Sequence, residues 1–175
     1  MTDVVFRNFL THQRDTALRL NAQSDILRLT LGPGPLPQNY IAEFRCKGLV
    51  QNRDGSISEG GLFVVGIFFP NDYLRRASTF EVLSWLGPAN VFHPNIANHS
   101  VCIGRLDPGT DLVTICYQLF EIIAYHRYNT RESDSLNRAA CSWARGHKHL
   151  FPTDTRPLKR PEASGAGKGG LSCQQ

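Results

Sequence analysis

Apolar side chains near the start of the chain recur every three or four positions, as on one face of an amphipathic helix. These positions are Phe6, Phe9, Leu10, Ala17 and Leu20. Only Gln13 interrupts the apolar face, and the polar run 21–25 ends it. Because Asp and Thr side chains accept hydrogen bonds from the first turn, Thr2 or Asp3 can cap the helix.

Four later segments have strand-like patterns. They span residues 27–31, 40–47, 62–69 and 80–85. The third is apolar on both faces, so we expect it to lie centrally in a sheet. Turn-forming residues occupy positions 32–37 and 52–55. Strands that follow one another through short turns predict an antiparallel meander.

Residues 86–110 contain six Gly or Pro residues and predict an irregular loop. Asp111 can then cap a helix with an apolar stripe over 112–123. A second helix is expected from Ser133 or Asp134, with Gly146 as its C-cap. The order is helix, four strands, active-site loop and C-terminal helices, which predicts an α+β fold with an antiparallel sheet.

Composition and charge narrow the possible functions. The chain has 175 residues, 41% hydrophobic and 19% charged, as in an ordinary globular domain. Residues 156–175 carry +3 of the net charge of +4, so the nearly neutral body argues against a nucleic-acid-binding face. The longest apolar run, 62–69, is too short to cross a membrane. We therefore expect one domain over 1–152 and a disordered basic Gly/Pro/Ser-rich tail over 153–175.

The cysteines predict a reducing compartment. Their number is five, which is odd, and their spacing is irregular, so a disulfide framework is not expected. The N-terminus has no basic segment before an apolar one and does not read as a secretory signal. Both observations favour the cytoplasm. Cys46, Cys116 and Cys141 fit the pattern of buried structural cysteines, whereas Cys102 lies in the Gly- and Pro-rich loop.

His93-Pro94-Asn95 precedes Cys102, and seven positions separate Asn95 from the cysteine. This pattern resembles the ubiquitin-conjugating enzyme family, in which an H-P-N tripeptide precedes the active cysteine by seven or eight residues. Further motifs occur in the family's order. They are Glu59-Gly60-Gly61-Leu62-Phe63, Phe69-Pro70-Asn71-Asp72-Tyr73, Cys102-Ile103, the helix over 112–123, and Asn129 followed by Asp134-Ser135-Leu136-Asn137. The resemblance covers roughly residues 3–151.

The resemblance implies a UBC-like fold and a transferase that needs no cofactor. A ubiquitin-like modifier protein would pass from an activating enzyme to Cys102 and then to a lysine of a target protein. Asn95 would support the oxyanion, Asp134 would condition the acceptor amine, and His93 and Pro94 would brace the loop. The family's proline-rich loop and W-S-P motif are missing, so docking of a RING ligase is not expected. The divergence resembles prokaryotic conjugating enzymes, some of which belong to antiviral defence systems.

The chemistry of these residue types agrees with those roles. A thiolate is the best biological nucleophile for taking an acyl group from another thioester. An amide N–H near the developing oxyanion is worth on the order of 3 kcal/mol, and a carboxylate helps a lysine to lose its proton. Asn95 can instead bond only the loop backbone, and Asp134 can instead be a helix N-cap.

Two other functions stay open from the residues alone. Inactive relatives with this fold serve as binding scaffolds for ubiquitin-like proteins, although the retained Cys102 and Asn95 favour an enzyme. A cysteine hydrolase would pair Cys102 with His93 or His99, but the sequence positions no general base. A metal site of His93, His99, Cys102 and Cys116 lacks a recognised ligand spacing, so no metal is expected.

Overall fold

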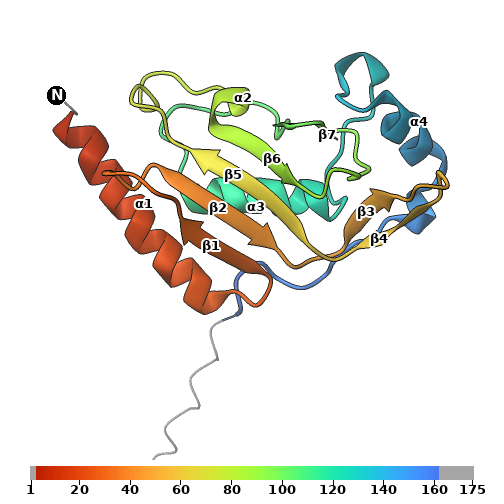
Figure 1. The fold of residues 1–175 in the computed structure, drawn as a ribbon, viewed down its shortest axis with the longest axis horizontal. Coiled ribbons are helices and arrows are strands. Elements are labelled where there is room, and N and C mark those ends of the chain that lie inside the picture. Colours follow the sequence, from red (N-terminus) through yellow and green to blue (C-terminus); the bar gives the residue numbers. More distant parts are fainter. Residues whose placement is uncertain (1–2, 162–175) are drawn as a thin grey trace, which may run out of the picture.

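A four-stranded antiparallel sheet, with one helix beside its edge and another across one face, forms the centre of the molecule (Figure 1). The structure is a computed structural model that describes residues 3–161. In chain order the elements are α1 (Val4–Gln23), β1 (Leu27–Leu31), β2 (Asn39–Phe44), β3 (Gly48–Gln51), β4 (Ile57–Gly60), β5 (Phe63–Phe68), α2 (Thr79–Val82), β6 (Leu83–Gly87), β7 (Ile96–Ala97), β8 (Ser100–Val101), α3 (Leu112–Ile123), η1 (Glu132–Asp134), α4 (Arg138–Gly146) and η2 (Lys148–Leu150). The expected α+β arrangement of an N-terminal helix, an antiparallel sheet and C-terminal helices is confirmed.

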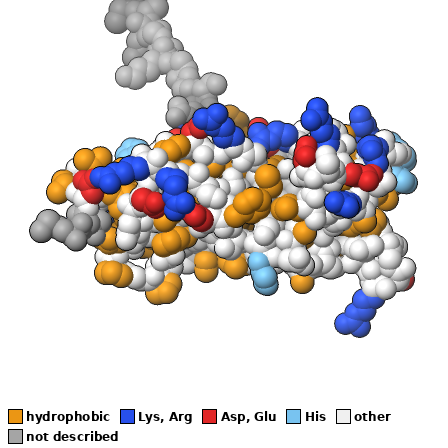
Figure 2. All heavy atoms as spheres, turned by 90° about the horizontal axis from the view of Figure 1, so that it is seen from above, with side chains coloured by type: hydrophobic (Ala, Val, Ile, Leu, Met, Phe, Trp, Pro, Cys, Tyr) orange, Lys and Arg blue, Asp and Glu red, His pale blue; other side chains and the backbone are white. Residues whose placement is uncertain are grey.

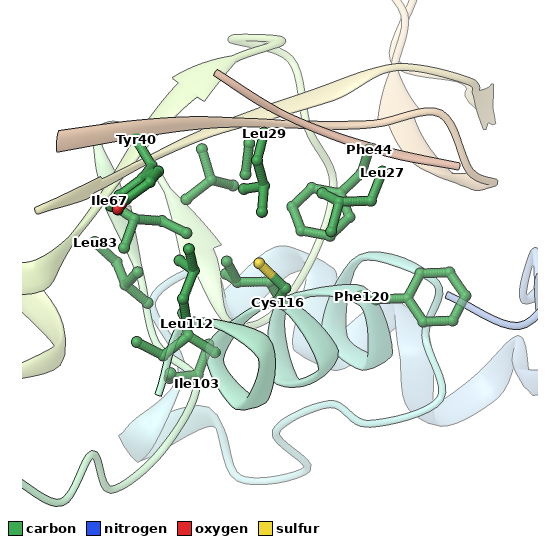
Figure 3. Close-up of a cluster of buried hydrophobic side chains, with 14 of the residues drawn as sticks. Leu27, Leu29, Tyr40, Phe44, Ile67, Leu83, Ile103, Leu112, Cys116 and Phe120 are labelled. Atoms are coloured by element: carbon green, nitrogen blue, oxygen red, sulfur yellow. The ribbon is translucent and has the colours of Figure 1, made fainter. Parts of the chain in front are cut away.

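The main core lies between this sheet and α3 (Figure 3). The strand order is β1-β2-β5-β6, and neighbouring strands are antiparallel. Side chains from the strands face the apolar stripe of α3. They include Leu27, Leu29, Tyr40, Phe44 and Ile67, opposite Leu112, Cys116 and Phe120. Burying this many large apolar side chains supplies most of the driving force for folding.

Gln13, which interrupts the apolar face of α1, has a structural role. It is 1% exposed, and its Oε1 accepts a 2.8 Å hydrogen bond from the backbone N–H of Leu112. That N–H lies in the first turn of α3 and has no partner within the helix. Asp3 caps α1 as predicted by accepting from the N–H of Val5. A polar residue on an apolar face thus fastens one helix to the start of another.

The predicted strands differ from the observed ones in four places. The second strand was expected over 40–47 but ends at Phe44. β5 lies centrally as expected, but only one of its faces is buried, and Phe68 on the other face is 41% exposed. Residues 79–82 form α2, so the fourth strand begins only at Leu83. The predicted turn at 52–55 belongs to an additional hairpin, β3–β4, whose strands of four residues are too short to show a clear period.

The last predicted helix begins later than expected. Ser133 and Asp134 lie in or beside the short 3₁₀ helix η1, and Asn137 caps α4 by accepting from the N–H of Ala140. The chain between them stays extended because the N–H groups of Leu136 and Asn137 both bond the carbonyl of Pro94. The helix ends with Gly146 as its last residue, and the C-cap is His147. The sequence therefore predicted the wrong residues at both ends of α4.

The expected disorder from residue 153 onward is also wrong over 153–161, where the chain packs against the domain. Leu158 is 1% exposed and joins the main core. Asp154 is 3% exposed and accepts hydrogen bonds from the N–H of Lys47 and from the Arg156 guanidinium. The Arg160 N–H donates to the carbonyl of Gln23 at the end of α1. The rest of the predicted tail, 162–175, including Cys173, lies outside the described residues.

No helix within residues 3–161 is both long and apolar enough to cross a lipid bilayer.

The four cysteines in this range, Cys46, Cys102, Cys116 and Cys141, are all free thiols. Figure 2 shows basic and acidic side chains intermixed over the visible face rather than gathered in a field of one sign. Several of them form exposed ion pairs, such as Arg14 with Asp15.

Candidate active site

A short hairpin joins the His93-Pro94-Asn95 segment to Cys102. β7 and β8 pair Ile96 with Val101, and the two-residue turn between the strands contains Asn98 at φ 54°. Asparagine tolerates this left-handed conformation better than most residues do. The register places Asn95 opposite Cys102, and the Cys102 N–H donates to the Asn95 carbonyl at 2.9 Å. The separation of seven positions between Asn95 and Cys102 therefore corresponds to a tight hairpin, with Asn95 directly before it and Cys102 directly after it.

The side chain of Asn95 fastens this pair to a third segment. Its Nδ2 donates to the Cys102 carbonyl at 2.9 Å, and its Oδ1 accepts from the Asn129 N–H at 2.7 Å. Both ends of the amide are therefore bonded to the backbone, as in the structural alternative raised from the sequence. The second N–H of Nδ2 is not used by these bonds and could still face a reacting carbonyl.

His93 lies beneath the hairpin. It is 1% exposed, and its Nδ1 accepts a 3.0 Å hydrogen bond from the Asn95 N–H, so the neutral ring carries its proton on Nε2. Nε2 has no partner within hydrogen-bonding limits. Burial lowers the pKa of His93 to about 3, and the nearby backbone of Ile122 opposes this shift only weakly. The ring stacks edge-on against Tyr125, with centroids 4.3 Å apart, so His93 acts as a neutral brace.

Two further residues, which the sequence analysis missed, hold the backbone beside His93 and Cys102. Tyr125 follows α3 at φ 59°, and its hydroxyl donates to the Phe92 carbonyl at 2.5 Å. A bulky residue in this left-handed region is uncommon, and such strain concentrates at functional sites. Arg127 donates from Nη2 to the carbonyl of Ile103, directly after the cysteine. No periodicity in the sequence points to either contact.

Cys102 is partly exposed and opens into a groove of about 390 Å³. The other lining residues are Asn95, Ile103, Gly104, Arg105, Gln118, Arg127, Tyr128 and Asn129. By contrast, Cys46, Cys116 and Cys141 are buried. Burial raises the pKa of the Cys46 thiol to about 12 and that of the Cys116 thiol further still, so these thiols stay protonated.

Asp134 does not line this groove. It is exposed in η1, and its carboxylate accepts a 3.0 Å hydrogen bond from the Ser133 hydroxyl. Its segment is nevertheless tied to the site, because the Pro94 carbonyl accepts from Leu136 and Asn137 a few residues later. Asp134 therefore lies on a loop anchored to the tripeptide, and not at the thiol itself.

The hydrolase and metal alternatives find no geometric support in the described part of the chain. Neither His93 nor His99 is among the described residues that line the groove with Cys102, so the structure places no histidine there as a general base. Within residues 3–161, no three His, Cys, Asp or Glu side chains gather closely enough to bind a metal ion. The polar side chains that line the groove are three amides, two guanidinium groups and the phenol of Tyr128, which suit the binding of carbonyls and anions.

No protein-family model matches this chain, and no curated protein is detectably similar to it. The case for a function therefore rests on the residues and geometry of the Cys102 groove.

Proposed function

We propose that the protein is a ubiquitin-conjugating-type enzyme that carries a ubiquitin-like modifier as a thioester on Cys102. The observation that carries this proposal is the placement of one partly exposed thiol in an open groove, opposite Asn95 across a tight hairpin. Among Cys46, Cys102, Cys116 and Cys141, this is the thiol that another protein could reach. The motif resemblance and the α+β arrangement support the same conclusion.

The first reaction moves an acyl group between two sulfurs. The Cys102 thiolate attacks the carbonyl carbon of the modifier's C-terminal thioester on the activating enzyme. A new C–S bond forms, the old C–S bond breaks, and the activating enzyme's cysteine leaves as a thiolate. The tetrahedral oxygen carries negative charge, which the unused N–H of Asn95 could stabilise by on the order of 3 kcal/mol.

The second reaction releases Cys102. A lysine amine attacks the thioester carbon, a C–N bond forms, and Cys102 leaves as a thiolate while the amine proton passes to a base or to solvent. Asp134 does not line the groove, so the role we propose for it is to attract and orient the lysine amine before the amine reaches the thioester, from a loop anchored to the Pro94 carbonyl. None of the described residues that line the groove is a histidine, which favours attack by an amine over attack by an activated water.

The test is to incubate the full chain with a candidate ubiquitin-like protein, its activating enzyme and ATP, and to run a non-reducing gel. We expect a thiol-sensitive adduct with the wild type, none with Cys102→Ala, and a thiol-resistant ester with Cys102→Ser. Cys141→Ala, which removes a buried thiol that contacts the Asn129 carbonyl, is the matched control and keeps the adduct.

A modifier that binds the chain tightly but forms no adduct, although it is loaded on the activating enzyme, contradicts the enzyme and supports a binding scaffold. An adduct that persists in Cys102→Ala contradicts the assignment of the acceptor. Free modifier released without any adduct would indicate a hydrolase instead.

A further inference from the structure

The wall of the Cys102 groove is cationic and polar. Arg105 and Arg127 line it, and none of the described residues that line it is acidic. The guanidinium groups do have carboxylate partners: Arg105 pairs with Asp107 at 2.8 Å, and Arg127 with Glu121 at 3.6 Å. These carboxylates do not line the groove, so a chain lying in it meets the arginines first.

The carboxylates of these ion pairs compete only weakly with a ligand for the guanidinium groups. The side chains of Arg105 and Asp107 are 88% and 65% exposed, and those of Arg127 and Glu121 are 48% and 45% exposed. Exposed pairs of this kind contribute about 0–1 kcal/mol. An acidic group entering the groove can therefore share either guanidinium, whereas a basic group meets two like charges.

Gln118 supplies a second, independent observation. It lines the same groove from α3, and its Oε1 is shielded from water without any hydrogen-bond partner. Leaving such an acceptor unpaired costs about 1–3 kcal/mol. The terminal torsion of glutamine is broad, so the Gln118 amide can rotate while the residue still lines the groove. This acceptor lacks a hydrogen-bond donor, and peptide backbones provide an N–H donor at nearly every residue.

From these observations we infer that the groove selects an acyl donor whose last residues form an extended, acidic peptide, with Gln118 accepting a backbone N–H. The inference rests on the proposed function, because an acyl group on the Cys102 sulfur must place its preceding residues beside that atom. Arg105 and Arg127 face the side chains of this peptide, and they disfavour a basic one.

Synthetic peptide thioesters test the inference without any partner protein. Two hexapeptides end in Gly-Gly with the same small-thiol leaving group, and carry either two Glu or two Arg just before the glycines. An acetyl thioester, which has no peptide N–H, is the third probe. In each reaction a C–S bond forms to Cys102 and the small thiol leaves. Intact-mass spectrometry then measures the rate of acylation of the full chain.

The acidic peptide is expected to acylate Cys102 about threefold faster than the basic one at low salt, and the difference shrinks at 1 M salt. Arg105→Gln, at a largely exposed site, reduces this preference. Gln118→Met lowers the ratio of peptide to acetyl rates at least fivefold. Gln51→Met, an exposed glutamine outside this groove, keeps the wild-type ratio.

Equal rates for the two peptides, or a faster basic one, would overturn the acidic selection while leaving Cys102 as an acyl acceptor. An unchanged ratio in Gln118→Met would overturn the role of Gln118. If neither the peptides nor the acetyl thioester acylate Cys102, the proposed function fails together with the inference.

Discussion

The surroundings of Cys116 and Cys102 show two ways of building a site in one small protein. Cys116 lies on α3, fully buried among apolar side chains of the sheet (Figure 3). Cys102 lies beside a hairpin whose position depends on hydrogen bonds donated by the Asn95 and Arg127 side chains and on one that the His93 ring accepts. One thiol is made inert by packing, and the other is kept accessible by a polar framework.

The two regions should therefore respond differently to change. Packing is non-directional and roughly proportional to the area buried, so a core mutation is expected to cost stability. Hydrogen bonds between backbone and side chain are directional, so a mutation in the hairpin is expected to move the thiol as well. The following predictions test how much each kind of contact contributes to stability, from the largest expected effect to the smallest.

Phe63→Ala should cause the greatest loss of stability. Phe63 is 0% exposed, and its ring lies 6.1 Å from that of Trp85. Removing a fully buried aromatic ring leaves a cavity, which lowers the free energy of unfolding by about 4 kcal/mol. Phe68→Ala, on the uncovered face of the same strand, should change it by less than about 0.5 kcal/mol. Denaturant unfolding measures both, and equal losses would contradict the assignment of the core.

His93 should make the protein sensitive to mild acid. Its pKa is about 3 in the folded state because of burial, against about 6.5 in the unfolded chain. Below pH 6.5 the His93 imidazole binds a proton in the unfolded chain but stays neutral in the folded protein. The free energy of unfolding therefore falls by up to about 1.4 kcal/mol per pH unit, or about 3 kcal/mol by pH 4.5.

The free energy of unfolding, measured from pH 7 to pH 4.5, checks this slope. His93→Gln should remove it, because the side chain no longer titrates. His99→Gln, which changes an exposed histidine of the same hairpin, should keep the wild-type slope. A slope that survives in His93→Gln would show that another group controls the acid response.

Asn95→Ala should cost about 2.5 kcal/mol, because the Cys102 carbonyl and the Asn129 N–H each lose a partner worth about 1–1.5 kcal/mol. Asn90→Ala is the matched control: this exposed asparagine makes one side-chain bond, to the Gln51 carbonyl, and should cost less than about 1 kcal/mol. Denaturant unfolding gives both values. Similar small losses would mean that the amide of Asn95 does not hold the hairpin.

Asp154→Asn extends the comparison to the segment after α4. Hydrogen bonds from Arg156 hold the pKa of Asp154 at about 2, against about 3.8 in the unfolded chain. The carboxylate therefore contributes about 2 kcal/mol at pH 7, and this is lost as the pH falls from about 3.8 to about 2. Unfolding at pH 7 should show the difference between wild type and variant, and at pH 2 it should be nearly gone. Asp15→Asn, at an exposed ion pair, should have little effect at either pH.

Where packing dominates, the sequence was informative. The apolar periods of α1 and α3 and the alternation in β1 and β2 identified these elements, because each presents a regular face to the core. The His93-Pro94-Asn95 tripeptide also identified the neighbourhood of Cys102. These features depend on local patterns that can be read without knowing the tertiary structure.

Where polar contacts between distant segments dominate, the sequence was not informative. β7 and β8 have two residues each, too few to show any period. Asp154 and Arg156 look like a solvated polar segment until Lys47, far away in sequence, provides a buried partner. In the sequence, Gln118 resembles any polar residue of an amphipathic helix. Only the tertiary structure shows that it lines the groove and that its Oε1 has no hydrogen-bond donor.

The most direct test of the central claim is to isolate the chain from its native cells in acid without reductant, and to locate any acyl group by mass spectrometry. The account predicts the C-terminal residue of a ubiquitin-like protein on Cys102, through a bond that a thiol cleaves. Finding Cys102 unmodified, while the activating enzyme in the same cells is loaded with the modifier, would contradict it.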